Sequence, residues 1–538
     1  MKINYSVKLV SPANTATLGN IDKITDIGVK LNSNGEPIFY GKQIKGILKN
    51  TMISFINALN LNKKDEFINR FFGEEGEDLI EKTFNKIRFS NLTLAEKSND
   101  IIKNRYGIRV DRKLKTAVPN SLFNYEYIKA GTIFNGSIEV NDNIDKNELR
   151  FILACLFHLD YIGGLKSRGL GKVEVLIEGR TIAELDKIIS NLKGKLKNKK
   201  LDLSISDNEL EKYSYTLKLK EPIILKKRSL GNYFYCKDII QGSTLRGALI
   251  RYFLKRGINL ETLLKLEVSD ALTGKVPLAS EFQTKYEIEK DKGKVSKDKV
   301  IYMEREFKNI KLERKSLSIL KVTGNEFSIG MDIKTRSAKE NLLFNHEFIE
   351  YYNELKGDIL APKGLLKNKD YTIYLGRLKS KGFGKAIISF APYENQEKSK
   401  LEERIERLNS QIKLEDKNII TFDLNSDLIL PFNEIYNIAE QFKMLLPFEI
   451  EMKFDSKRSF INTDILHGYN IINNSRKVDE LIICRGSVIT YEIPQYKNYL
   501  AELKSIEDKG LGLRKYEGFG KVKICSERGD ECGTIKGI

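Results

Sequence analysis

Histidine and cysteine are scarce in this chain. Its 538 residues include three histidines and five cysteines, and no two cysteines stand in a Cys-x-x-Cys pair. Zinc sites and disulfide frameworks need such residues at close, regular spacing. The scarcity therefore argues against both and indicates a reducing, cytoplasmic setting. It also leaves acid–base catalysis by histidine dependent on His346 or His467, because His158 lies in an apolar run typical of a packing residue.

Long apolar runs are missing as well. No stretch approaches the length of a membrane span. Residues 1–10 alternate like a strand and lack the apolar centre of a signal peptide. Hydrophobic residues nevertheless make up 41% of the chain, and its length suffices for about three or four domains. We therefore expect a folded protein without membrane contact.

Positive charge is in excess. The chain has 91 lysines and arginines against 73 aspartates and glutamates, a formal net charge of +18. Such an excess is compatible with a polyanionic partner such as nucleic acid. Composition alone does not separate that partner from a merely solvated surface.

Three glycine turns repeat along the chain. Leu165–Lys172, Leu378–Lys385 and Arg514–Lys521 each carry two glycines spaced two apart, flanked by basic residues and followed by an apolar, β-branched run. The pattern predicts a basic turn that leads into a strand. Such a turn can bring backbone N–H groups and cations close to phosphates.

Further signals repeat in the same order. Ala117 precedes Phe123 as Ala338 precedes Phe344, and Gly41–Lys49 is echoed by Gly242–Ile250. Ordered repetition of this kind indicates internal duplication. The first copy has helical spacing from Gly41 to Ile56. The second predicts a helix from Ser243 onward, with Ser243 or Thr244 as its N-cap.

The order of elements predicts an α+β fold. Strand, loop, helix, further strands and a closing strand after a glycine turn are typical of split βαβ, ferredoxin-like units with antiparallel sheets, an arrangement that RNA-recognition folds also use. The predicted organisation is a first domain at 1–186, a linker at 187–211, a second domain at 212–396 with an exposed insertion at about 285–300, a helical connector at 397–416 and a third, shorter domain at 417–538.

The familiar cofactor motifs fail on inspection. In Gly169–Lys172 the position where a phosphate-binding loop begins with glycine is Lys166, and Val173 stands where Ser or Thr would bind magnesium. Glu174 occupies the third glycine position of a dinucleotide fingerprint. We expect no organic cofactor.

Three stretches carry a family resemblance: Thr25–Gly46 with its Asp-x-x-Val, Gly-x-Pro and Lys-Gly elements; Ile108–Ala117 followed by Leu122–Glu126; and the set Gly468–Asn470, Arg485–Val488 and Gly510–Gly520. They resemble the RAMP superfamily of CRISPR-associated proteins. The most similar form is the subtype III-D subunit of the Csx-ten family, in which a Cas-seven-like domain, here the first, is fused to a Cas-five-like part, here the second. The family's Ile-Pro-Gly-Ser before the first helix is replaced by Phe39–Lys42 and by Ile240–Ser243.

The resemblance implies a CRISPR-RNA-binding subunit of a cytoplasmic, RNA-guided antiviral effector complex of type III-D. The chain would hold the guide backbone and its 5′ tag. Its partners would be CRISPR RNA, complementary target RNA, the large palm-domain subunit and backbone RAMP subunits. A guide must be held through its phosphates, because its bases have to stay available for pairing. The RNA contacts expected on this basis are Lys42, Lys45, Lys49, Arg112, Lys166, Arg168, Gly169, Gly171, Lys172, Arg246, Lys379, Lys381, Gly382, Gly384, Arg514, Lys515, Gly518 and Gly520.

The resemblance also implies a cleavage residue. Asp26 matches the aspartate that supports metal-assisted cleavage of target RNA in backbone-type subunits, which makes it the candidate catalytic residue and ligand of Mg²⁺ or another divalent cation. Asp22 is its nearby competitor, Asp238 is the weaker counterpart in the second block, and a simple loop-capping aspartate is the structural alternative.

Two other functions stay open at this point. One is a guide-RNA-processing endoribonuclease, a role that related proteins perform with histidine or tyrosine together with lysine, and against which the scarcity of histidine weighs. The other is a protein-binding assembly scaffold without direct RNA contact.

Overall fold

The computed structural model of the chain comprises two compact units. Unit 1 comprises Met1–Lys199, Lys220–Ile224 and Gly376–Lys385, and unit 2 comprises Lys200–Leu219, Leu225–Leu375 and Ala386–Ile538. The structure describes residues 1–15, 17–18, 26–32, 34–58, 68–69, 71–72, 87–97, 100–110, 116–140, 144–194, 206–274, 276, 278, 285–288, 295–301, 324–331, 338–350, 354–394, 400–412, 418–432, 437–447, 449, 451–467, 469–470, 475–476 and 478–526. Two short segments of the predicted second domain thus belong to unit 1.

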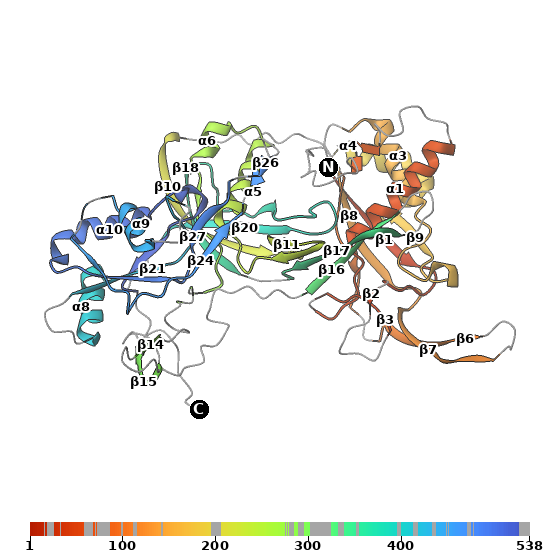
Figure 1. The fold of residues 1–538 in the computed structure, drawn as a ribbon. Coiled ribbons are helices and arrows are strands. Elements are labelled where there is room, and N and C mark those ends of the chain that lie inside the picture. Colours follow the sequence, from red (N-terminus) through yellow and green to blue (C-terminus); the bar gives the residue numbers. More distant parts are fainter. Residues whose placement is uncertain are drawn as a thin grey trace. The chain divides into compact units, whose positions relative to one another are not determined.

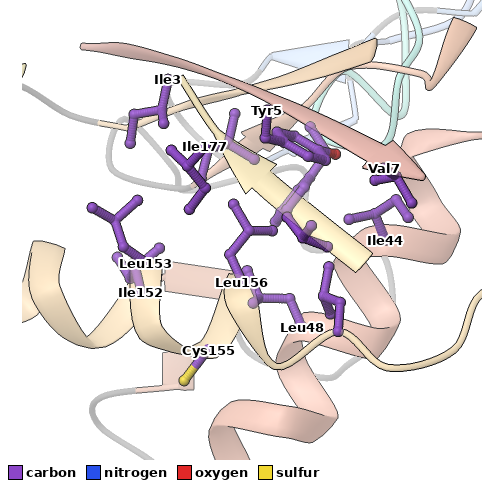
Figure 2. Close-up of a cluster of buried hydrophobic side chains, with 14 of the residues drawn as sticks. Ile3, Tyr5, Val7, Ile44, Leu48, Ile152, Leu153, Cys155, Leu156 and Ile177 are labelled. Atoms are coloured by element: carbon purple, nitrogen blue, oxygen red, sulfur yellow. The ribbon is translucent and has the colours of Figure 1, made fainter. Parts of the chain in front are cut away.

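The core of unit 1 lies between an antiparallel sheet and two helices. The sheet has the order β4 (Arg88–Phe89), β8 (Ile133–Glu139), β1 (Lys2–Leu9), β9 (Val173–Ile177), and β5 (Thr93–Leu94) also pairs with β8. Side chains of β1 alternate between buried and exposed positions, as expected for a sheet with one covered face. Helices α1 (Gly41–Ala58) and α3 (Lys146–Phe157) cover that face (Figures 1 and 2).

The helices bury an apolar stripe against this sheet. Ile44 and Leu48 lie one turn apart on α1, and Leu156 of α3 meets them over the side chains of β1 (Figure 2). A capping box fixes the start of α3, because the Asp145 carboxylate accepts a hydrogen bond from a helix amide while Glu148 reaches back to the amide of Asp145. Burial of this stripe holds the helices on the sheet.

Unit 2 repeats the sheet of unit 1. Strand β10 (Ser206–Leu219) lies between β18 (Leu355–Lys363) and β20 (Lys385–Pro392), as β1 lies between β8 and β9. Tyr5 faces Gly136 across the first sheet, and Tyr215 faces Gly357 across the second. A Cβ would lie 3.0 Å from Tyr5 Cζ at Gly136 and 2.6 Å from Tyr215 Cζ at Gly357, so both glycines make room for a tyrosine ring. The duplication inferred from sequence therefore extends into the core.

A third sheet of the same design follows. Strand β21 (Ile419–Leu424) lies between β28 (Val488–Glu492) and β29 (Val522–Ile524), and β23 (Lys453–Phe454) extends the edge beside β28. Each closing strand, β9, β20 and β29, follows a glycine turn. This arrangement confirms the predicted α+β fold of tandem ferredoxin-like units with antiparallel sheets and glycine turns.

A second type of sheet accompanies the first two copies. In unit 1 it has the order β2 (Thr17–Leu18), β3 (Ile27–Gly28), β7 (Ala117–Ile128), β6 (Ile102–Val110). In unit 2 it has the order β11 (Lys226–Leu230), β12 (Tyr233–Cys236), β17 (Ala338–Phe348), β16 (Gly324–Met331). In both, the outer pair is an antiparallel hairpin, and its inner strand pairs in parallel with a short strand. Figure 1 shows the β6–β7 hairpin projecting from the rest of unit 1.

The predicted cap of the second helix is wrong. Helix α5 (Gly242–Leu254) begins one residue before Ser243, its N-cap is Gln241, and no side chain within the cap binds the helix amides. Instead, the Gly242 amide donates to Asp270 Oδ1 at 2.7 Å. The cap thus comes from a residue distant in the sequence, which local pattern rules do not detect.

The other helical predictions are confirmed: α1 covers the predicted span from Gly41 to Ile56, and α8 (Leu401–Ile412) lies in the predicted connector. The remaining elements are η1 (Lys166–Arg168), η2 (Ile182–Glu184), α4 (Leu185–Gly194), α6 (Leu260–Leu264), β13 (Glu267–Val268), β14 (Lys285–Ile288), β15 (Val295–Ile301), β19 (Tyr371–Tyr374), β22 (Leu428–Ile429), α9 (Ile438–Met444), β24 (Thr463–Leu466), β25 (Tyr469–Asn470), β26 (Ser475–Arg476), β27 (Glu480–Ile483), η4 (Tyr496–Tyr499), α10 (Leu500–Lys509) and η5 (Lys515–Glu517). None of the helices in the described ranges combines the length and apolarity needed to span a bilayer.

A buried ion pair fastens the segment Lys220–Ile224 within unit 1. Arg88 of β4 bonds Glu221, and their side chains are 10% and 8% exposed. Glu221 also accepts a hydrogen bond from the Lys385 amide at 3.2 Å. Burial raises the pKa of Glu221, and the Arg88 charge opposes that rise. The pair therefore positions the second glycine turn, which ends at Lys385, in unit 1.

Candidate nucleic-acid interface

The three glycine turns have one backbone conformation. The first residue of each turn has positive φ although it is not glycine: 55° at Leu165, 54° at Leu378 and 55° at Arg514. The first glycines have φ of 82°, 90° and 92°, and the second glycines 84°, 88° and 72°, at Gly169 and Gly171, Gly382 and Gly384, and Gly518 and Gly520. Residues other than glycine rarely adopt such angles. The repeated sequence therefore encodes one turn, built three times.

The amide of the second glycine in each turn is hydrogen-bonded within the protein. The amides of Gly171, Gly384 and Gly520 donate to backbone carbonyls at 2.7, 2.8 and 2.8 Å, respectively. A Cβ at Gly171 would overlap the Ile162 carbonyl oxygen. These amides bind the protein's own backbone, so they are not available to bind phosphate in this conformation.

The first glycine of the second turn lies against the start of α1. Asn91 Oδ1 accepts a hydrogen bond from the Gly41 amide at 2.9 Å, and Asn91 Nδ2 donates to the Gly382 carbonyl at 2.8 Å. A Cβ at Gly382 would overlap Asn91 Oδ1 and lie 3.0 Å from the Gly41 nitrogen. We call this arrangement a turn–helix joint: a glycine turn on a helix start whose first amide binds an Asn or Asp side chain.

The third turn forms the same joint in unit 2. Asp270 takes the place of Asn91 and accepts from the Gly242 amide. A Cβ at Gly518 would lie 2.7 Å from the Val268 carbonyl oxygen and 3.4 Å from Gly242 Cα. Burial raises the pKa of Asp270 to about 7, and the hydrogen bond from Gly242 opposes the rise.

The first turn is open. No described atom lies within 4 Å of the position that a Cβ on Gly169 would take. Lys166 and Arg168 are exposed, and the Arg168 guanidinium lies over the Phe123 ring, 5.1 Å from its centroid. This contact brings the turn to the β6–β7 hairpin.

One face of that hairpin is basic and aromatic. Phe123 is paired with Gly107 and Tyr125 with Arg105, so these four positions share a face. The Phe123 ring covers Gly107, where a Cβ would lie 2.8 Å from a ring carbon. The Phe123 and Tyr125 rings stack with 6.2 Å between their centroids. The opposite face carries exposed apolar side chains, Tyr106, Ile108 and Leu122, which are 65%, 54% and 67% exposed.

Asp26 lies beside this face. It is exposed; its amide donates to the Asn124 carbonyl at 3.1 Å, and its Oδ2 accepts from the Asn124 amide at 2.8 Å. The carboxylate thus pins the loop before β3 to β7, next to Phe123. Within the described ranges, no three acidic, histidine or cysteine side chains gather into a possible metal site, and the competitor Asp22 lies outside those ranges.

The second block has no aspartate at the position equivalent to Asp26. Ile27 pairs with Tyr125 in unit 1 and Phe234 pairs with His346 in unit 2, and the two partners, numbered 125 and 346, keep the spacing of Ala117 and Ala338. The residue before Phe234 is Tyr233, which therefore takes the place of Asp26. The weaker candidate, Asp238, instead forms an ion pair with Arg485 at 3.2 Å.

The sheet containing Tyr233 carries basic and aromatic side chains on both of its faces, which sequence inspection missed. Every residue of β11 is exposed. The Lys226 ammonium lies 5.3 Å from the Phe234 centroid, and the Arg228 guanidinium lies 4.8 Å from that of Tyr235. His346 stacks on Phe234 at 4.5 Å with 15° between the planes. The run Lys226–Leu230 followed by Tyr233–Cys236 was the available signal, because three consecutive basic residues are followed closely there by three consecutive aromatic ones.

Two predicted arginine contacts are engaged by the protein itself. Arg246 donates to the carbonyls of Leu264 and Leu266, both at 2.7 Å, and lies over the Tyr516 ring at 4.7 Å. Arg514 bonds Glu480 and Glu517 and lies 5.1 Å from the centroid of a neighbouring phenylalanine ring. Both arginines hold the third turn in place.

The predicted lysines occupy varied surroundings. Lys42, Lys45 and Lys49 share a half-buried side of α1, and Lys45 Nζ donates to Ser380 Oγ at 2.9 Å. Lys379 and Lys381 are half-buried, and Lys172 and Lys515 are exposed. Lys515 also lines a cavity of 1230 Å³ in unit 2, whose walls carry both acidic and basic side chains. Arg112 lies outside the described residues.

Comparison with known proteins gives a family match for part of the chain. The model of the RAMP superfamily matches residues 8–174, which contain β4, β5 and β8 of the first sheet, the β6–β7 hairpin and the first glycine turn. Among curated proteins, no sequence matches. Similar solved chains come from the cryo-EM structures of type III-B Cmr-beta in the apo state and bound to cognate target RNA. They are 14% and 13% identical, cover 33% and 35% of this chain and 97% and 98% of their own, and each has a TM-score of 0.27.

Replacement by alanine is predicted to destabilise the protein by different amounts at Gly169, in the open first turn, and at Gly382, in the docked second turn. Gly169→Ala meets open space, so it costs only the backbone strain of a positive φ, about 1–3 kcal/mol. Gly382→Ala carries the same strain and also overlaps Asn91, which adds about 1–3 kcal/mol from overpacking. We expect the urea midpoint of unit 1 to fall further for Gly382→Ala. Equal midpoints would contradict the close seating of the second turn.

Asp270→Asn tests the buried carboxylate. The folded pKa of about 7 exceeds the usual value of an unfolded aspartate, so the folded state binds the proton more tightly. This contribution to stability is complete below the unfolded pKa and is lost as pH rises towards 7, by at most about 1.4 kcal/mol per pH unit. Asparagine cannot titrate and can still accept from Gly242. In calorimetry, the unfolding temperature of the variant relative to that of wild type should therefore be higher at pH 8 than at pH 5. A difference that does not change with pH would contradict the raised pKa of Asp270.

Proposed function

We propose that this chain is a CRISPR-RNA-binding subunit of a type III effector complex, of the III-D kind, and that it holds the backbone and 5′ tag of the guide. The observation that carries the proposal is the set of basic and aromatic side chains that lie together on the two repeated hairpin sheets. In unit 1 Arg168 lies over Phe123. In unit 2 Lys226 lies over Phe234 on one face of the sheet and Arg228 lies over Tyr235 on the other. The RAMP match over residues 8–174 and the resemblance of the motifs support the proposal.

The chemistry of these faces suits single-stranded RNA. Aromatic rings offer stacking surfaces for bases, at about 1–3 kcal/mol per base, irrespective of sequence. Guanidinium groups bind phosphate oxygens in a bidentate manner. A cation held over a ring is already positioned, so less side-chain entropy is lost on binding. Such a surface binds RNA without reading its sequence, as a guide holder must.

Target-RNA cleavage at Asp26 is the second candidate function. Its exposed carboxylate accepts a hydrogen bond from the amide of Asn124, the residue that follows Phe123 on β7. Mg²⁺ is commonly bound by one or two carboxylates together with water and substrate phosphates. Among the described residues no three acidic, histidine or cysteine side chains gather into a metal site, so the ion would be shared with RNA. The proposed partners are guide and target RNA and the other subunits of the complex, in the cytoplasm.

Charge removal on β11 tests RNA binding. We expect the double variant K226A/R228A to weaken guide binding and to lower the slope of log affinity against log salt by about 1.4, because two phosphate contacts are lost. The control pair K443A/K509A removes the same charge at two exposed lysines of unit 2 and should leave the slope unchanged. Fluorescence anisotropy over a salt series provides the measurement. Equal slopes for both double variants would count against RNA contact at β11, and absence of RNA binding by wild type would favour a protein scaffold.

Asp26→Asn tests cleavage. Asparagine keeps an oxygen that can accept from the Asn124 amide, but it removes the negative charge. In the assembled complex with guide, magnesium and labelled target RNA, we expect one cut to disappear from an otherwise normal ladder at single-nucleotide resolution. Asp26→Ala serves as the comparison, since it removes the hydrogen bond as well. An unchanged ladder with the guide still bound would leave the chain a structural RNA clamp.

A further inference from the structure

The turn–helix joint has a fixed set of contacts in its two occurrences. In both, the helix begins with glycine, at Gly41 or Gly242, and a side chain from beyond a neighbouring strand, Asn91 or Asp270, binds the glycine amide. The first glycine of the turn, Gly382 or Gly518, packs against this arrangement.

A further contact recurs four residues into the helix. Lys45, four residues after Gly41, donates to Ser380, the third residue of the second turn. Arg246, four residues after Gly242, lies over Tyr516, the third residue of the third turn. A basic side chain one helical turn from the glycine therefore contacts the middle of the docked turn in both joints.

The first turn has the geometry of a docked turn, but among the described residues no helix start packs against its first glycine. Its backbone angles match those of the other two at all three special positions. Its second glycine, Gly171, makes the same internal hydrogen bond. The region around Gly169 is open where Gly382 and Gly518 are closely packed. The contacts of the second and third turns therefore indicate which kind of helix start the first turn can bind.

We infer that the first glycine turn, Leu165–Lys172, is a docking surface for a helix start on a different subunit. That helix begins with glycine, carries Lys or Arg four residues later, and has its first amide bound by an Asn or Asp side chain. The inference rests on the proposed function, since the partner is then a neighbouring subunit of the RNA-guided complex with the same domain design.

A second copy of this chain does not fit the surface. Its helix starts at Gly41 and Gly242 are already covered by its own second and third turns. In its third block, α9 begins at Ile438 after Asn437, not at glycine. Docking and RNA binding also use different atoms of the first turn: docking uses the backbone around Gly169, and the RNA face uses the side chain of Arg168.

The test is Gly169→Glu in the tagged full-length chain, expressed with the complete complex and compared with Gly179→Glu. Gly179 has φ of 74° and is equally open, so the control carries the same strain and charge. By native mass spectrometry we expect Gly169→Glu to reduce one neighbouring subunit at least tenfold, and the control to retain it. A full complement of subunits with Gly169→Glu would overturn the inference, as would loss of a second copy of this chain.

A second variant covers the case in which Gly169→Glu does not fold. Lys166→Cys places a thiol at an exposed position of the turn, and a bulky maleimide can be attached to it after folding. Labelled protein should then fail to take up the same subunit, whereas wild type treated with the maleimide should take it up; uptake by the labelled variant would also overturn the inference. If the wild-type complex contains no RNA, the proposed function is wrong. The effect of the label on the uptake of protein subunits then still shows whether the first turn is a docking surface.

Discussion

A hydrogen bond to the first amide of a helix organises much of this chain. The amides at helix starts lack partners within the helix, and here Asn91 and Asp270 supply them for Gly41 and Gly242. Because glycine has no Cβ, a turn can approach the helix start until backbone meets backbone. The joint therefore orders three things together: the helix, the strand end that supplies the cap, and the turn that leads into a closing strand.

The two copies share this framework but differ in the polar and charged side chains that it carries. The tyrosine and glycine pairs of the sheets are the same in both copies, but the neutral cap Asn91 has become the ionisable Asp270. On the hairpin sheets, Asp26 of the first copy corresponds to Tyr233 of the second. The framework positions tolerate little change because each side chain fills a defined space. The exposed positions have diverged, which is where a difference in function between the copies would arise.

Local patterns were sufficient to predict the fold class. Alternation identified β1, and helical spacing identified α1 and α8, because these elements bury one face along a continuous segment. The failures concern contacts between distant segments. The cap of α5 comes from Asp270, 28 residues away, so a local rule placed it at Ser243 or Thr244. The turns were recognised, but the seating of the second and third on helix starts depends on Asn91 and Asp270, which no spacing rule connects to them. Arg168 was predicted, whereas Phe123 was noticed only as a marker of the repeat and the basic and aromatic side chains of β11 and β12 were missed.

The division of the chain between the two units limits how the protein can be cut. The backbone passes from one unit to the other after Lys199, Leu219, Ile224, Leu375 and Lys385. Residues 1–199 alone therefore lack two segments of unit 1, including Glu221, the buried partner of Arg88, and Gly382, the partner of Asn91. A protease that nicks one connection leaves the units joined by the others. An amino-terminal fragment expressed alone would expose a buried arginine, so the smallest autonomous form of unit 1 is a discontinuous one.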